Sequence, residues 1–145
     1  MYRYIVAIYL RLSVDDKRVE SMSIESQRLL LRKYAEILGD NVEIIEYVDN
    51  GYSGTNFERP AVQQLLTDVK TYKVNCILVK DFSRFGRNSI EVGYFTQQIF
   101  PLFGVRFISV SDNYDSDEHK GDTGGIAVAV KYLVNEYYSR DLSVK

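Results

Sequence analysis

The chain has 145 residues, which is the usual size of one compact domain and too short for two full ones. Its 18 basic and 20 acidic residues give a net charge of −2, and 46% of its residues are hydrophobic. These values predict an ordinary globular domain and argue against both disorder and a protein that coats nucleic acid through bulk positive charge.

The first half of the chain contains two strand patterns, each followed by a helical pattern. The strands are short, rich in Val and Ile, and almost continuously apolar, as in a sheet that is covered on both faces. Gly39 is a stop signal for the first helix, and a proline fits the first turn of the second. In chain order we expect a strand at Tyr4–Tyr9, a helix at Ile24–Leu38, a strand at Val42–Val48 and a helix from Pro60 to Val69.

The second half continues the alternation. A third strand is predicted at Asn75–Val79 and a fourth at Val105–Val110. Between them, Asn88 is typical of a helix N-cap, and Pro101 is expected to end or kink the helix that follows. Strictly alternating strands and helices predict an α/β fold with a mostly parallel central sheet of four or five strands and helices on both faces.

The last segment has a different character. Residues 112–125 are polar and rich in glycine, which predicts a mobile loop. A helical stripe then runs from Ile126 to Tyr138 without a stop signal before Lys145. We therefore expect an α/β domain over residues 1–122, the start of a long, truncated C-terminal helix over residues 123–145, and a chain that is a fragment of a longer protein.

Few metal-ligating side chains are present. The lone Cys76 has no partner for a disulfide, and its apolar neighbours predict a buried, inert thiol. One cysteine, the single His119 and scattered acidic residues argue against a metal site. No apolar run is long enough for a membrane helix, and no signal-peptide pattern is present, which predicts a cytoplasmic domain without a membrane partner.

Arg11 and Ser13 follow the first strand, at the sheet edge where active sites of α/β folds lie. If the strand conformation continues, the two side chains point to the same side. They are either a serine nucleophile with a cationic partner, or a surface arginine beside a turn-forming serine. A Ser-His-Asp triad is excluded, because His119 lies in a polar segment and no Gly-x-Ser-x-Gly motif occurs.

The exits of the second and third strands are also rich in arginine. Arg84 and Arg87 follow the third strand and would share a face if the turn is helical, while Arg59 follows the second. Arginine suits bidentate contact with phosphate, although a solvated basic turn is the alternative. No glycine-rich phosphate loop or dinucleotide motif is present, which disfavours a nucleotide cofactor.

Together these strand exits describe one serine among four arginines. Such a site suits nucleophilic attack on a phosphodiester. The arginines would neutralise the non-bridging oxygens, stabilise the charge of the transition state and lower the cost of ionising the serine hydroxyl.

The same residues resemble the catalytic domain of the serine recombinases, the resolvase/invertase family. The resemblance covers nearly the whole chain in the correct order, and the segment 135–141 is similar to large serine recombinases of mobile elements. The motifs that carry it are Tyr9-x-Arg11-x-Ser13, Gln27, Asp49-x-Gly51-x-Ser53-Gly54 with Arg59, and Lys80-Asp81-Phe82-Ser83-Arg84-Phe85-Gly86-Arg87.

The resemblance implies a mechanism and a set of partners. The nucleophile would cleave DNA and keep the bond energy in a 5′-phosphoserine link, so that neither a metal nor a small-molecule cofactor is expected. Strand exchange would take place in a homo-oligomer, a dimer that becomes a tetramer when active, with the C-terminal helix mediating subunit contacts and leading toward DNA-binding domains. The implied roles are Ser13 as nucleophile, Arg11, Arg84 and Arg87 as ligands of the scissile phosphate, Arg59 and Gln27 as supports, and Asp49 as the residue that positions these groups.

One departure from the family pattern concerns Ser83, because the family often has Asp at this place. An acid/base role proposed for that Asp cannot be transferred, and the neighbouring Asp81 is a candidate partial substitute. Two other classes of protein fit the sequence less well. A flavodoxin-like or receiver-type interaction domain would need clustered acids at the strand ends, and a Rossmann-type nucleotide enzyme would need the missing glycine motif.

Overall fold

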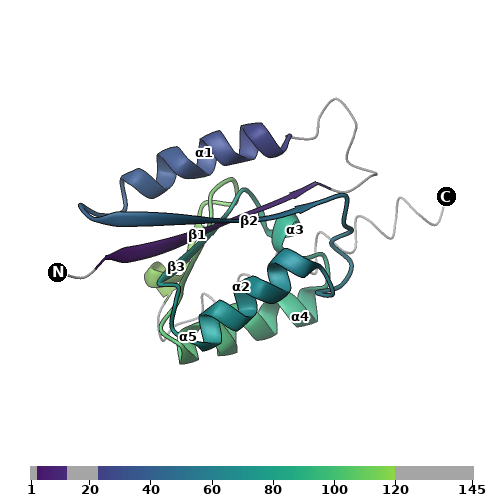
Figure 1. The fold of residues 1–145 in the computed structure, drawn as a ribbon. Coiled ribbons are helices and arrows are strands. Elements are labelled where there is room, and N and C mark those ends of the chain that lie inside the picture. Colours follow the sequence, from purple (N-terminus) through teal and green to yellow (C-terminus); the bar gives the residue numbers. More distant parts are fainter. Residues whose placement is uncertain (1–2, 13–22, 120–145) are drawn as a thin grey trace.

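The computed structural model describes residues 3–12 and 23–119, which form a five-stranded sheet (Figure 1). The strand order is β2-β1-β3-β4-β5, with the first four strands parallel and β5 antiparallel to β4. This confirms the predicted mostly parallel α/β sheet. The strands are β1 (Tyr4–Leu12), β2 (Val42–Asn50), β3 (Cys76–Val79), β4 (Arg106–Ser109) and β5 (Tyr114–Asp115).

Helices cover both faces of the sheet. Helix α1 lies on one face, while α2 and the run from α4 to α5 lie on the other, as Figure 1 shows. The short helix α3 follows β3 directly. The helical elements are α1 (Ile24–Glu36), α2 (Pro60–Lys70), α3 (Phe82–Phe85), α4 (Ser89–Tyr94), a π-helical turn (Phe95–Ile99), α5 (Phe100–Leu102) and a 3₁₀ turn (Ser116–His119).

The alternation of side chains along β1 creates two separate cores. Val6, Ile8 and Leu10 pack in the core beneath α1, whereas Ala7 and Tyr9 pack in the core beneath α2. Because successive strand residues point to opposite faces, Arg11 falls on the same side of the sheet as Tyr9. The strand thus carries its arginine into the α2 side of the molecule.

The order of the connections determines where a binding site can form. The chain passes from β1 through α1 to β2 on one face, and returns from β2 through α2 to β3 on the other. The strand order therefore reverses between β1 and β3. Ligands of open α/β sheets bind outside the carboxyl ends of the strands at such a switch point. Arg11 is the penultimate residue of one of these strands, and the arginine-rich segment follows the other.

Two strands are longer than predicted. β1 continues to Leu12 and β2 to Asn50, because parallel pairing persists through Arg11 with Asp49 and through the last pair. Polar side chains do not end a strand whose backbone still has a partner. In contrast, β3 is one residue shorter than predicted, because it begins at Cys76 and not at Asn75. The Oδ1 atom of Asn75 accepts the amide of Ile5 at 2.8 Å.

Two helix boundaries also differ from the prediction. α1 ends at Glu36 rather than Leu38, because the next amides bond to the carbonyls of Tyr34 and Ala35 in a tighter turn. Of the two outcomes predicted for Pro101, an end or a kink of the helix, the first does not occur. The preceding π-helical turn, in which the Phe100 amide donates to the Phe95 carbonyl, accommodates a residue that lacks an amide hydrogen, and the helix runs on to Leu102.

The described part of the segment predicted to be a loop from residue 112 contains a short strand and a 3₁₀ turn. Tyr114 and Asp115 pair with β4, and Arg106 forms an ion pair with Asp115. Pairing with β4 and the Arg106–Asp115 ion pair hold this segment in place. A polar composition alone reveals neither interaction. The predicted helix from residue 123 lies outside the described residues. In the part of the chain that is described, no helix is long and apolar enough to cross a membrane.

We predict that Cys76 resists alkylation in the native protein. Its side chain is fully buried, and this burial raises the pKa of the thiol to about 12, so that little of the reactive thiolate forms at neutral pH. Iodoacetamide at pH 8 should label the protein only after it is unfolded in urea, as measured by mass spectrometry. Labelling at equal rates with and without urea would contradict the buried position.

Candidate active site

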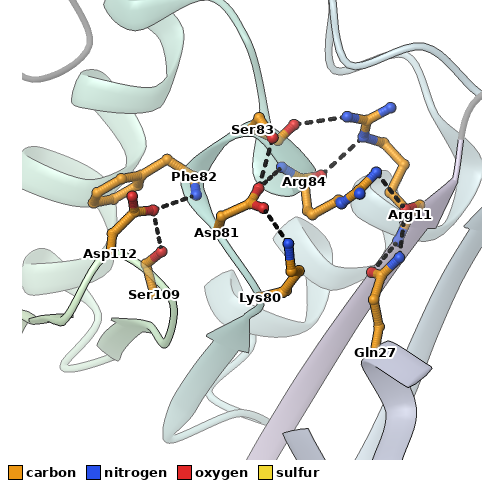
Figure 2. A network of polar contacts seen from close by, with 9 residues as sticks. All are labelled: Arg11, Gln27, Lys80, Asp81, Phe82, Ser83, Arg84, Ser109 and Asp112. Atoms are coloured by element: carbon orange, nitrogen blue, oxygen red, sulfur yellow. Dashed lines mark hydrogen bonds and ion pairs between the residues drawn. The ribbon is translucent and has the colours of Figure 1, made fainter. Parts of the chain in front are cut away.

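The side chain of Arg11 lies inside the protein and contacts three main-chain carbonyls. Its exposed fraction is 0%, so it is not the surface arginine of the alternative interpretation. Nη2 donates to the carbonyl of Ser83 at 2.7 Å, Nε to that of Arg84 at 3.0 Å and Nη1 to that of Tyr52 at 3.1 Å. Figure 2 shows the first two of these contacts, which join the end of β1 to helix α3.

Gln27 holds the main chain at the same position. Its Oε1 accepts the Arg11 amide at 3.3 Å, and its Nε2 donates to the Arg11 carbonyl at 3.0 Å. The pairing of β1 with β3 reaches only to Ile8, so β3 offers the main chain of Arg11 no hydrogen-bond partner. The fully buried side chain of Gln27, from α1, supplies these hydrogen bonds instead. Arg84, which is 6% exposed, also directs Nη1 to the Arg11 carbonyl at 3.4 Å.

Arg59 contacts the last two carbonyls of α3, one of which it shares with Arg11. Its Nη2 donates to the Phe85 carbonyl at 2.6 Å, and its Nη1 donates to the Arg84 carbonyl at 3.3 Å. The guanidinium carbon lies 4.9 Å from the centre of the Phe57 ring, close enough for a cation–π contact. Like Arg11, Arg59 places a buried positive charge at the negative end of this helix.

Asp49 reaches the start of α2. Its two carboxylate oxygens accept the amides of Ala61 and Val62 at 2.8 and 3.0 Å, which caps a helix whose own N-cap residue makes no side-chain cap. Tyr9 links this carboxylate to the arginines, because its hydroxyl donates to Asp49 and accepts from Arg59, both at 2.7 Å. Burial raises the pKa of Tyr9, so the hydroxyl stays protonated.

Asp81 caps the amino end of α3. Its Oδ1 accepts the hydroxyl of Ser83 at 2.6 Å and the amide of Arg84 at 3.1 Å, and its Oδ2 lies 3.2 Å from Nζ of Lys80. Burial alone would raise the pKa of Asp81, but the Ser83 hydrogen bond and the charges of Lys80 and Arg84 lower it overall. The group is therefore an ionised acceptor at neutral pH, which suits a cap and not a general acid.

Arg87 does not share a helical face with Arg84. The helix ends at Phe85, and Gly86 is extended with φ −176°, so that Arg84 is buried while Arg87 is exposed. A Cβ at Gly86 would come within 2.8 Å of both the Phe57 ring and Val92, and only a glycine fits at this close approach.

Gly54 connects the loop after β2 to this segment. Its carbonyl accepts the Arg87 amide at 2.8 Å, and a Cβ there would lie 2.9 Å from Nη2 of Arg11 and 3.2 Å from the Ser83 carbonyl. The loop thus packs directly on the buried guanidinium.

Most of the predicted site residues lie at one edge of the sheet. The structure joins Arg11, Gln27, Arg59 and Arg84 through the contacts above, and Asp49 through Tyr9. Ser13 lies outside the described residues, one position beyond the end of β1. Tyr9 belongs to one of the sequence motifs, but the motif predicts no role for it. Its spacing of two from Arg11, on the same face of the strand, was the available signal.

The arrangement defines an α/β domain with several guanidinium groups at the carboxyl end of its central strands, an edge suited to an anionic substrate. A cluster of at least three His, Cys, Asp or Glu side chains that could hold a metal ion is not found among residues 3–12 and 23–119. The positive charge at this edge comes from side chains of the chain itself.

Comparisons with known proteins agree with this description. The family model described as "Resolvase, N terminal domain" matches residues 6–144. The N-terminal catalytic domain of TP901-1 integrase is 31% identical with a TM-score of 0.72, over 95% of this chain and 98% of that chain. A resolvase family site-specific recombinase from Streptococcus pneumoniae is 30% identical with a TM-score of 0.67, over 98% of this chain and 92% of that chain.

A protein of Bacillus subtilis (strain 168) named as a DNA recombinase is 30% identical over 82 residues, which are 57% of this chain and 16% of that protein. The chain thus matches only a small part of this curated relative. It belongs to the resolvase N-terminal domain family and is a catalytic domain of the serine recombinase class. The predicted family resemblance and fold are confirmed, and the interaction-domain and nucleotide-enzyme alternatives are set aside.

We predict that Gly54→Ala destabilises the protein. The new methyl group would press on the Arg11 guanidinium and the Ser83 carbonyl, and overpacking of this kind costs about 1–3 kcal/mol. Gly93→Ala is the matched control, since its Cβ meets only Gln97 Nε2 at 3.7 Å and alanine favours the helix. Urea denaturation should show a loss of unfolding free energy for the first variant and none for the second.

We also predict an acid-sensitive contribution from Asp81. Its pKa is lower in the folded protein than in the unfolded chain, so ionisation stabilises the fold at neutral pH, and this contribution is lost as the pH falls below about 4. Asp81→Asn keeps an accepting oxygen but not the charge. Its stability deficit relative to the wild type should shrink between pH 6 and pH 3 in urea titrations.

The variant Asp40→Asn, at an exposed turn before β2, controls for the removal of one carboxylate. A deficit of Asp81→Asn that stays constant over this pH range would show that the charge of Asp81 does not act as described.

Proposed function

We propose that this chain is the DNA-cleaving part of a site-specific recombinase and that Ser13 is its nucleophile. The hydroxyl oxygen would attack a DNA phosphorus, forming a 5′-phosphoserine bond as the bond from phosphorus to the 3′ oxygen breaks. The serine proton is lost, and the departing 3′ oxygen gains a proton. Religation is the same transfer in reverse, with the 3′-hydroxyl as nucleophile and the serine as leaving group.

The observation that carries this proposal is the arginine-rich edge at the end of β1. Arg11 is anchored at both its main chain and its guanidinium, and Ser13 follows it two residues later. Holding a nucleophile in a fixed geometry and surrounding the phosphate with positive groups are the two main contributions to phosphoryl transfer. The guanidinium groups at this edge and the anchored main chain of Arg11 support the proposal.

The arginines divide into two kinds by their exposure. Arg87 is exposed and is the arginine most accessible to a phosphate, whereas Arg84 is 6% exposed and directs its guanidinium to the Arg11 carbonyl. Arg11 and Arg59 are buried on carbonyls and build the support. A phosphate contact by Arg11, which the family resemblance implies, requires its guanidinium to exchange a carbonyl for a phosphate oxygen when DNA binds.

DNA is the proposed substrate, and the whole protein would act as a homo-oligomer, a dimer that becomes a tetramer during strand exchange. Residues 123–145 would begin the helix that joins subunits and leads toward DNA. The phosphoserine stores the energy of the broken phosphodiester, so the proposed exchange requires no nucleotide as an energy source.

We predict that Ser13→Ala abolishes covalent attachment to DNA and leaves DNA binding largely intact. The full-length protein would be incubated with genomic DNA of its source, denatured in detergent, and the attached DNA sequenced to identify the site. Ser26→Ala is the matched control, because this exposed serine is in none of the motifs and its hydroxyl bonds only locally, to that of Ser23. The control should still form the link, and attachment by Ser13→Ala would refute the assignment of the nucleophile.

A further inference from the structure

Helix α3 has only four residues, and its position decides where Arg84 lies. An isolated helix of this length is not stable in water, so contacts at its two ends must hold it in place. Arg11 and Arg59 bind the carbonyls at its carboxyl end, and Asp81 caps its amino end from within the same segment. A further contact at the amino end comes from a distant part of the chain.

That contact is made by Asp112, which follows β4 and lies 30 residues after Phe82. Its Oδ2 accepts the amide of Phe82 at 2.8 Å and the hydroxyl of Ser109 at 2.7 Å, as Figure 2 shows. Ser109 is the last residue of β4, and its side chain is fully buried. It therefore directs the carboxylate oxygen toward the first amide of α3.

The ring of Phe82 is held by the same region of the sheet. It stacks on Phe107 of β4 with 6.1 Å between ring centres, and lies 5.4 Å from the ring of Tyr114 in β5. Phe82 is 2% exposed. The main chain and the side chain of the first α3 residue are thus both fixed to the β4–β5 hairpin, and Asp112 supplies the main-chain part.

The charges at the two ends of α3 are arranged to match its dipole. Two carboxylates, those of Asp81 and Asp112, lie at the amino end, and two guanidinium groups, those of Arg11 and Arg59, lie at the carboxyl end. Negative charge at the amino end and positive charge at the carboxyl end both stabilise a helix. Removing Asp112 would leave the amide of a buried residue without this acceptor.

We propose that Asp112 is a positioning residue for DNA cleavage, which holds the amino end of α3 so that Arg84 stays in place beside Arg11. This inference rests on the proposed function of the chain. Asp112 itself touches no reacting atom. Its effect passes through the Phe82 amide to the helix that carries the arginine.

The test measures the rate of covalent attachment to the DNA sequence recovered with the wild-type, full-length protein. Displacing a catalytic group by about 1 Å costs on the order of a hundredfold in rate, and we expect a loss of this size for Asp112→Ala, with DNA binding unchanged. Asp112→Asn retains an oxygen that can accept both hydrogen bonds and should recover most of the rate.

Ser109→Ala provides a second, milder variant. It removes the hydroxyl that orients the carboxylate and should lower the rate less than Asp112→Ala does. Because Ser109 acts here through Asp112, the double variant should cleave no more slowly than Asp112→Ala alone. A general loss of stability would instead make the two effects add.

Asp68→Ala is the matched control. This carboxylate accepts the hydroxyl of Tyr47 at 2.7 Å, a hydrogen bond of the same length on the α2 side of the sheet and away from α3. Its loss should leave the cleavage rate unchanged at a temperature where all variants are folded. Hydrogen exchange of the Phe82 and Arg84 amides should be faster in Asp112→Ala and unaltered in Asp68→Ala.

Wild-type rates in Asp112→Ala, no recovery in Asp112→Asn, or additive effects with Ser109→Ala would each overturn the positioning role. If the wild-type protein forms no DNA link at all, the proposed function fails first, and the role in cleavage fails with it. Hydrogen exchange distinguishes the two cases, because it reports the contact with α3 independently of cleavage.

Discussion

The structure of this site depends on the burial of two arginine side chains against the last carbonyls of one short helix. Arg11 and Arg59 are 0% and 2% exposed, and together they bind the carbonyls of Ser83, Arg84 and Phe85. Burying a guanidinium is costly unless its donors are satisfied, and helix-end carbonyls are unsatisfied acceptors with partial negative charge. The guanidinium groups and the helix-end carbonyls satisfy each other's hydrogen bonds. These bonds hold the end of β1, the start of α2 and helix α3 together.

The same interactions connect stability with chemistry. Tyr9 and Asp49 extend the network from Arg59 to the first amides of α2, and Gln27 extends it from Arg11 to α1. A substitution in this network would disturb both the fold and the site, because the residues that support the edge are charged or polar and buried. For a catalytic domain of this family, activity alone therefore does not separate a phosphate ligand from a support, and only paired variants with structural controls do so.

Much of the architecture follows from local patterns. Apolar runs of strand length, Gly39, Pro60 and the Asn88 cap were sufficient to predict the order of the elements and the parallel sheet. The predictions were wrong where a partner far away in the sequence decides the outcome. β1 and β2 extend through polar residues because they pair with each other, and residues 114–115 form a strand because β4 offers an open edge. The spacing of Arg84 and Arg87 did not reveal that Gly86 would be extended between them.

The sequence by itself determined the class of fold, the family and the set of candidate residues, since these depend on residue types and on their order. It also placed Arg11 and Arg84 at or after the carboxyl ends of strands that become neighbours. Only the tertiary structure decided which arginines are buried and which is exposed, and that Tyr9 and Asp112 belong to the network. The physical reason is that the residue type is the same whether a guanidinium faces solvent or a carbonyl. Only the packing of β1, α2 and α3 brings the carbonyls of α3 within hydrogen-bond distance of the buried guanidinium groups.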